Sequence, residues 1–265
     1  MKKKWYRIEN KTNSADIYIY DEIGMWGVDA KDFATSLALI KDFDQINVFI
    51  NSPGGDVFEG MAIYNALLTV KDKLTAHVMG MAASIASIIL MAAPKRVIHQ
   101  GALVMIHNPS SGVWGTASDL RKRAETLDKI TDQMVDIYRG VTGLEDSEIR
   151  KLLDDETWMK ADEAVEKGFA TELNEEEAAA SLQKKYASKF HNLPSEVVIV
   201  EEPTIREAED ALRDAGFSQA VAKKILSQGF NRDDCDPRRD GDEDFSEAIQ
   251  MLDKMIKNVG GIHRG

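Results

Sequence analysis

The sequence predicts a layered α/β domain, and three observations lead to this prediction. Short β-rich runs alternate with helical patterns through the first part of the chain, an order typical of strands covered by helices. The length of 265 residues is enough for one large domain, or for one domain with an appendage. With 43% hydrophobic and 29% charged residues, the composition is that of a folded globular protein, which excludes wholesale disorder.

The predicted strands are short apolar runs, and most of them end at turn residues. They cover residues 16–20, 46–50, 74–79, 97–98 and 102–106. The helices predicted between them cover residues 30–43, 56–70 and 81–93. Gly80 is predicted to break the third strand, and the almost entirely apolar helix after it is predicted to be buried in the core.

A long amphipathic helix is predicted over residues 118–139, with Ser118 as its N-cap. Its apolar stripe has three-to-four spacing and consists of Leu120, Ala124, Leu127, Ile130, Met134 and Ile137. Shorter helices are predicted over 147–153 and 162–167, the second of them closed by Gly168.

The composition changes in the last third of the chain, and we place a domain boundary near residue 190. Residues 1–190 form the predicted α/β domain, and residues 191–265 form an acidic, mainly helical tail. Around the boundary, a charged, alanine-rich stretch predicts a helix over 175–187, and a short apolar run occupies 197–200. In the tail, helices are predicted over 205–215, 218–227 and 245–259, with an Asp/Arg-rich loop at 231–244.

Charge and cysteine content exclude several classes of function. The formal net charge of −12 disfavours binding to nucleic-acid phosphates. The single cysteine, Cys235, cannot form an internal disulfide, and no Cys/His cluster has zinc spacing, so no metal is predicted. The basic N-terminus lacks the apolar run of a secretory signal, and the apolar stretch 78–93 is too short to span a bilayer. A cytoplasmic protein that binds neither membrane nor nucleic acid is expected.

The first candidate for chemistry is Ser84, within the small-residue segment 80–87, Gly-Met-Ala-Ala-Ser-Ile-Ala-Ser. The serine opens an apolar helix after a strand, where helix N–H groups favour an oxyanion. Close packing of small residues on a buried helix explains the same pattern without any function. The segment also differs from the Gly-x-Ser-x-Gly pattern of α/β-hydrolases.

The second candidate is His107, which follows the apolar strand 102–106 where the chain leaves the core. A general base needs a rigid element beneath it and access to a pocket. A histidine that packs in the core or caps a strand is the alternative.

The third candidate is the turn at residues 51–56, Asn-Ser-Pro-Gly-Gly-Asp. Two glycines between a strand and a helix expose backbone N–H groups, which can bind an oxyanion or an extended peptide. A tight strand-to-helix connection needs the same glycines and is the alternative.

The fourth candidate is the acidic segment 154–156, Asp-Asp-Glu. A carboxylate can fix the tautomer of a catalytic histidine and stabilise the imidazolium. Acidic residues oppose the dipole at a helix C-terminus, which favours a purpose other than helix stability. A solvated acidic loop is the alternative.

Taken in order, these segments resemble the signatures of the ClpP family of serine peptidases. The similarity lies in residues 51–55, 80–84 and 105–109, and in 156–165 as the acidic-residue region. It extends over roughly residues 14–174. The sequence is most similar to the phage-type branch, whose members act as head maturation proteases.

The resemblance implies a ClpP/crotonase-like spiral of β/β/α units with a long handle helix, and a Ser-His-acid triad. It places the nucleophile at Ser84, the general base at His107, and the oxyanion-hole donors at the backbone N–H groups of Gly55 and Ile85. The family's triad aspartate aligns with Glu156, which is one methylene longer, and Asp155 is the reserve candidate. This chemistry requires no metal or other cofactor.

The same resemblance implies a protein or peptide substrate and a homo-oligomeric ring. The tail is predicted to bind capsid or scaffold proteins or to regulate access to Ser84, or to be a small helical appendage without a partner. Three other functions stay open. They are an ATP-dependent proteolytic subunit that works with an ATPase unfoldase, a catalytically silent assembly protein on the same fold, and an acyl-CoA enzyme of the crotonase type.

Overall fold

The computed structural model describes residues 6–10, 13–24, 30–178 and 180–201, and short pieces at 208–209, 212–213, 219 and 222–223. The chain divides into two compact units, Met1–Val200 and Glu201–Gly265. This division lies beyond the boundary predicted near residue 190, because residues up to Val200 pack with the first unit. The helices predicted in the tail and the loop at 231–244 lie wholly or mostly outside the described residues.

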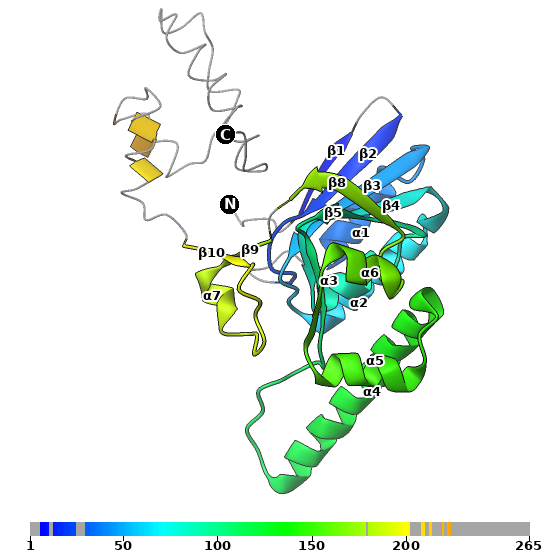
Figure 1. The fold of residues 1–265 in the computed structure, drawn as a ribbon, viewed down its shortest axis with the longest axis vertical. Helices are drawn as coiled ribbons and strands as arrows, with labels where there is room; N and C mark the ends of the chain where they lie inside the picture. Colours follow the sequence, from blue (N-terminus) through cyan, green and yellow to red (C-terminus); the bar gives the residue numbers. More distant parts are fainter. Residues whose placement is uncertain are drawn as a thin grey trace, which may run out of the picture. The chain divides into compact units, whose positions relative to one another are not determined.

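The first unit is built on an eight-stranded sheet, which confirms the predicted α/β class (Figure 1). Six strands follow each other in the spatial order β1-β2-β3-β4-β5-β8. Their bounds are β1 Tyr6–Asn10, β2 Ser14–Ile19, β3 Gln45–Ser52, β4 Leu74–Ala83, β5 Lys95–Gln100 and β8 Glu172–Glu177. All neighbours in this row are parallel except β1 and β2, which are antiparallel.

The sheet divides along β4, and this division creates the edge where the candidate site lies. The first half of β4 pairs with β5, and its last residues pair in parallel with β6, Leu103–Ile106. The short strand β7, Thr157–Met159, continues this branch antiparallel to β6. The predicted strand break at Gly80 was wrong, because pairing with β6 keeps β4 extended as far as Ala83.

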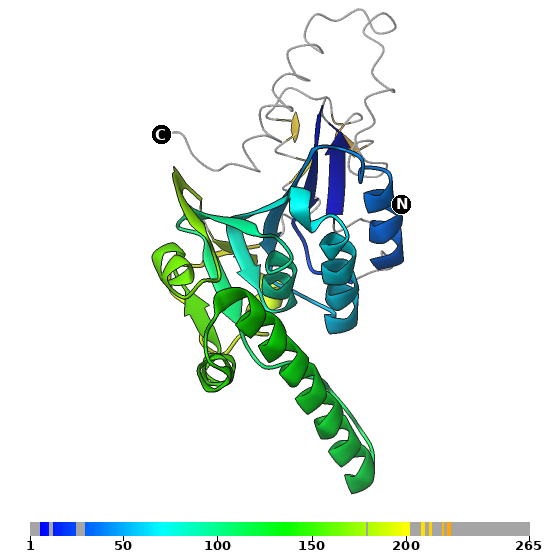
Figure 2. The ribbon, with the colours of Figure 1, turned by 90° about the vertical axis from the view of Figure 1, so that its right-hand side faces the viewer.

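Helices on one face of the sheet enclose the main core (Figure 2). They are α1 Ala30–Ala38, α2 Val57–Leu68 and α3 Ile85–Leu90. Strand β3 shows the pattern that fills this core, since Ile46, Val48 and Ile50 alternate with less buried residues. Helices α1 and α3 are shorter than predicted, whereas α2 matches its predicted range closely.

The long helix α4, Ala117–Thr142, extends away from the rest of the first unit (Figure 2). Its N-cap is Thr116, not the predicted Ser118, because Thr116 and Asp119 form a reciprocal capping box. The second half of α4 buries Met134, Val135 and Tyr138, whereas Leu120 near its start is 47% exposed. One end of the predicted apolar stripe therefore faces away from the core of its own protomer.

Two shorter helices follow α4, close to their predicted positions. They are α5, Asp146–Asp154, and α6, Ala161–Glu166. Gly168 has a φ of 76°, the left-handed conformation that ends a helix, so its predicted role after α6 is confirmed.

The helix predicted over 175–187 was wrong for most of its length. Residues up to Glu177 extend β8 along the edge of β5, and Ser181–Gln183 form β9; only Lys184–Ala187 are helical, as α7. Pairing with neighbouring strands has overridden the local preference of residues 175–183 for a helix. Strand β10, Val198–Val200, then pairs in parallel with β9.

A second core lies under this C-terminal segment, where side chains from β4 and β6 meet those of residues 180–197. Its buried members are Met81, Ala83, Leu103, Met105, Ala180, Leu182, Tyr186, Phe190 and Val197. Ala83 directly precedes Ser84, Met81 lies three residues before it, and Met105 lies two residues before His107. The segment therefore packs against the strands that lead into the candidate site.

Candidate active site

Ser84 lies at a sharp turn between β4 and α3. Its backbone has φ 56° and ψ −128°, a combination that is uncommon for a residue with a side chain. Its N–H donates to the carbonyl of Met105 on β6, at 2.9 Å. Among the described residues other than glycine, only Ser84 and Glu156 have positive φ. Strain of this kind collects at functional sites.

The pairing of β4 with β6 brings His107 to Ser84. Ala83 is opposite Met105, so the residues that leave the two strands are neighbours. A hydrogen bond of 2.8 Å joins Oγ of Ser84 to Nε2 of His107. The His107 side chain is 20% exposed, so the pair is partly protected from water but still accessible.

Glu156 reaches the other nitrogen of the same ring. It directly precedes β7, and Thr157 pairs with Ile106, so Glu156 and His107 extend from adjoining strand ends. The distance between Oε2 of Glu156 and Nδ1 of His107 is 3.8 Å, longer than a hydrogen bond. Catalytic contacts are often this loose before substrate binds. Glu156 is buried, whereas the reserve candidate Asp155 is exposed.

Backbone groups that the sequence did not predict hold the Glu156 carboxylate. The N–H groups of His191 and Asn192 both donate to its Oε1, each at 2.7 Å. The side-chain amide of Asn192 also donates to the carbonyl of Asp155 at 2.9 Å. The sequence carries no signal for these contacts, because every residue except proline has a backbone N–H that could make them.

Burial lowers the pKa of His107 below its ordinary value of 6.5, and the charge of His191 acts in the same direction. The negative charge of Glu156 opposes both effects by favouring the imidazolium. The net shift favours a neutral imidazole at neutral pH. This is the form that can accept a proton from the Ser84 hydroxyl.

Of the two predicted oxyanion donors, Ile85 directly follows Ser84 in the chain, and Gly55 directly follows Gly54, which lies against Ser84. Ile85 is the first residue of α3, so its N–H has no acceptor within the helix. Gly55 forms an isolated bridge to Ile23, in which Gly54 accepts and Asp56 donates. Because peptide groups alternate in direction along extended backbone, the N–H of Gly55 itself points away from Ile23.

Close packing explains why two positions beside the nucleophile are glycines. A Cβ on Gly54 would lie 2.7 Å from Cβ of Ser84, and a Cβ on Gly60 of α2 would lie 2.2 Å from Cγ1 of Ile85. Both contacts are too short for real carbon atoms. The loop after β3 and helix α2 therefore lie directly against the turn that carries Ser84.

A buried hydroxyl pair supports the same turn from below. Oγ of Ser87 donates to the carbonyl of Ser84 at 2.5 Å and lies 2.7 Å from the hydroxyl of Tyr138. Tyr138 belongs to α4 and is fully buried, which raises the pKa of its hydroxyl. The long helix is thus connected to the nucleophile by one chain of hydrogen bonds.

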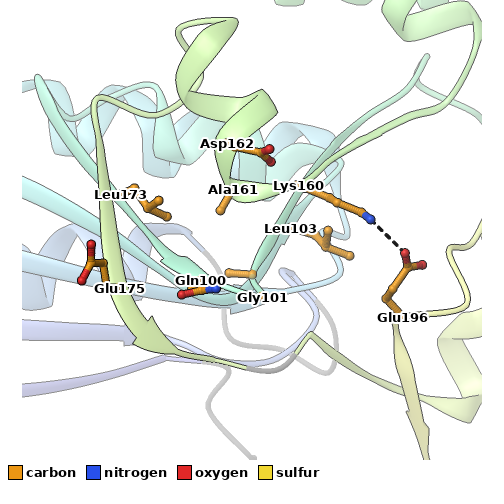
Figure 3. Close-up of a pocket in the computed structure, with 10 residues that line it drawn as sticks. Gln100, Gly101, Leu103, Lys160, Ala161, Asp162, Leu173, Glu175 and Glu196 are labelled. Atoms are coloured by element: carbon orange, nitrogen blue, oxygen red, sulfur yellow. Dashed lines mark ion pairs between the residues drawn. The ribbon is translucent and has the colours of Figure 1, made fainter.

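A pocket of about 670 Å³ lies at the opposite end of the β6–β7 pair from His107 (Figure 3). Its lining residues are Gln100, Gly101, Ala102, Leu103, Lys160, Ala161, Asp162, Leu173, Glu175 and Glu196. Lys160 and Glu196 form an ion pair of 3.1 Å at this pocket. The lining includes none of Ser84, His107 and Glu156, so the pocket is separate from the candidate active site.

The described residues form neither a candidate metal site nor a candidate membrane-spanning helix. No group of His, Cys, Asp or Glu side chains in the described part of the chain has an arrangement that could hold a metal ion. Within the same residues, no helix combines the length and apolar character needed to cross a membrane.

Comparison with known protein families places the chain. Residues 1–177 match the Clp protease family. The match includes Ser84, His107, Glu156, Gly55 and Ile85. It ends before the segment that supplies the N–H groups to Glu156.

Proposed function

Because the chain belongs to the Clp protease family, whose members are serine peptidases that typically form oligomeric rings and bind protein substrates, we propose that Ser84, His107 and Glu156 form its catalytic triad. The observation that carries this proposal is the 2.8 Å contact between Oγ of Ser84 and Nε2 of His107. It occurs at a strained turn between a strand and a helix, a geometry that exposes a nucleophile. The buried carboxylate facing Nδ1 favours Glu156 over Asp155 as the acid.

Peptide-bond hydrolysis follows from this arrangement in two halves. Oγ of Ser84 attacks the substrate carbonyl carbon while Nε2 of His107 accepts the hydroxyl proton, and the N–H groups of Gly55 and Ile85 bind the resulting oxyanion. The C–N bond then breaks, and His107 donates its proton to the leaving amine. Water, deprotonated by His107, attacks the acyl-enzyme. The ester bond then breaks, the carboxylic acid product leaves, and His107 returns the proton to Oγ of Ser84. Glu156 stabilises the imidazolium in both halves.

Labelling of the serine tests this mechanism directly. We expect a fluorophosphonate probe to label the wild-type chain covalently, and Ser84→Ala to remove both the label and hydrolysis of a fluorogenic peptide. Ser147→Ala is the matched control, because Ser147 is an exposed serine on α5, outside the candidate site; it is expected to retain the label. A folded wild-type oligomer that the probe does not label would favour a catalytically silent assembly protein.

For the biological substrate, we propose capsid or scaffold proteins during phage head maturation, in the cytoplasm of the host cell. The motif resemblance supports this branch of the family, and residues 178–265 lie beyond the family match. Cleavage of folded assembly proteins without ATP is expected. Strict dependence on an ATPase unfoldase would instead favour the ATP-dependent proteolytic subunit.

The tail is proposed to bind these assembly proteins. Because His191 and Asn192 contact Glu156, a chain shortened at residue 190 would also disturb the candidate site. The informative comparison is therefore between the full chain and residues 1–200, the first compact unit. Equal binding of both to capsid assembly proteins would contradict a role for residues 201–265 of the tail.

A further inference from the structure

Residues 184–197, which we call the strap, contact the candidate active site and are attached to the rest of the first unit both before and after the residues that make this contact. Near the start of the strap, the Tyr186 hydroxyl donates to Asp21 at 3.1 Å, and Lys189 forms an ion pair with Glu22. Near its end, Glu196 forms an ion pair with Lys160 (Figure 3). The strap is thus held at both ends by groups outside the proposed triad.

The middle of the strap packs against the ring of the proposed general base. The Phe190 ring lies 6.2 Å from the His107 ring and 5.2 Å from the Trp158 ring, measured between centroids. Phe190 is buried in the second core together with Met105 of β6. These apolar contacts fix the position of the next two residues, His191 and Asn192, beside the Glu156 carboxylate.

The backbone N–H groups of His191 and Asn192 hold one oxygen of the Glu156 carboxylate. The other oxygen is directed at His107. Oε1 of Glu156 accepts both N–H bonds at 2.7 Å, the short length typical of a charged acceptor. Oε2 is buried and has no hydrogen-bond partner among the described residues. With Oε1 fixed, Oε2 lies 3.8 Å from Nδ1 of His107, so its remaining bonding capacity faces the ring.

The length of the Glu156 side chain explains why its carboxylate needs hydrogen bonds from the strap to hold it in place. A glutamate has one more rotatable bond than an aspartate, so its carboxylate has more positions to lose on ordering. Glu156 also starts from a backbone with φ 47°. Two N–H donors on one oxygen restrict both the position and the rotation of the carboxylate.

We propose that the backbone N–H groups of His191 and Asn192 are positioning groups that orient Glu156 toward His107. This inference rests on the proposed triad and extends it to a segment that the family match does not include. These two N–H groups act through Glu156, because both donate to its carboxylate and neither donates to Ser84 or His107. A purely structural strap would stabilise the fold without affecting the base.

Backbone ester substitution tests the N–H groups without changing side-chain size. Asn192 is replaced in the full chain by its α-hydroxy analogue, which puts an ester oxygen in place of the N–H, and the same exchange at His191 provides a second variant. Exchange at Leu193 is the matched control, because its N–H is not a donor to Glu156. All variants are compared by circular dichroism and by hydrolysis of a fluorogenic peptide.

We expect the exchange at either donor position to lower kcat about tenfold or more, with KM of the short peptide within about twofold. The acidic limb of the pH profile should move to lower pH, because a less ordered Glu156 favours the imidazolium less. In a Glu156→Gln background the exchange should cause no further loss, since the N–H groups act through the carboxylate. The Leu193 exchange should leave kcat within about twofold of wild type.

Two outcomes would overturn the inference. One is wild-type kcat and pH profile in both folded donor variants. The other is a loss that is equally large in the Glu156→Gln background or in the Leu193 control, which would indicate a general effect on stability. In either case, covalent labelling of wild-type Ser84 would leave the proposed peptidase function standing. Absence of that labelling would count against the proposed function itself.

Discussion

Three hydrogen bonds fix the position of Ser84. The Met105 carbonyl accepts its backbone N–H, the Ser87 hydroxyl donates to its carbonyl, and His107 bonds its Oγ. Such a turn is costly in isolation, because a positive φ is unfavourable for serine. The surrounding contacts offset this cost and hold the hydroxyl ready before substrate binds.

The lowered pKa of His107 gives a prediction about the pH dependence of activity. The base must be neutral to accept the Ser84 proton, so kcat/KM falls as the pH drops through the pKa of His107. Since burial lowers this pKa, the acidic limb should lie below about 6.5, the ordinary value for histidine. A profile of peptide hydrolysis between about pH 4 and 9 measures it.

Glu156→Gln should change that profile in a defined direction. Removing the negative charge removes the effect that raises the pKa of His107, so the acidic limb should move to still lower pH. We also expect kcat to fall about a hundredfold or more, because the imidazolium loses its stabilising partner. Asp155→Asn is the control, since Asp155 is exposed. An unmoved limb in Glu156→Gln would contradict the role of Glu156.

Among the elements, the contact between α2 and α3 decides where the oxyanion donors lie. Gly60 allows α2 to approach Ile85, whose N–H is one of the two proposed donors. On the other side of the nucleophile, Gly54 allows the loop after β3 to approach Ser84. The donor geometry thus depends on packing between elements as well as on the local turn.

Gly60→Ala tests this contact against a matched glycine. We expect the free energy of unfolding to fall by about 1–3 kcal/mol, because the new methyl group overpacks against Ile85. Gly140→Ala in α4 is the control, because a Cβ there meets nothing within 4 Å; it should stabilise the protein by about 0.5–1 kcal/mol. Urea denaturation measures both values. Equal stability of the two variants would contradict close packing at Gly60.

At the scale of the whole molecule, exposed apolar residues at the start of α4 bear on how subunits assemble. The first half of α4 extends away from the rest of the first unit (Figure 2). Leu120 in this half is 47% exposed, and Trp114 in the preceding loop is fully exposed. Because members of this family typically form rings, a second copy of the chain is the expected partner that covers these apolar groups. We therefore propose that the start of α4 contributes to contacts between subunits.

Size measurement checks this proposal. Light scattering after gel filtration should give a mass several times the 29.5 kDa of one chain. Leu120→Glu should reduce that mass, because it places a charge on the apolar contact. Lys122→Glu, an exposed change in the same half of α4, should leave the mass unchanged. A monomeric wild-type chain would rule out the proposed contact.

The sequence by itself determined the α/β class, most of the helices and the residues that flank the candidate nucleophile and base. These features depend on apolar spacing, glycines and turn residues within a few positions of each other, so they can be predicted locally. Only the tertiary structure decided that β4 continues past Gly80, that 175–177 extend a strand, that Glu156 and not Asp155 is buried, and that the strap N–H groups hold it. Each of these outcomes depends on strand register or burial against residues that lie far away along the chain, and local periodicity contains no information about such partners.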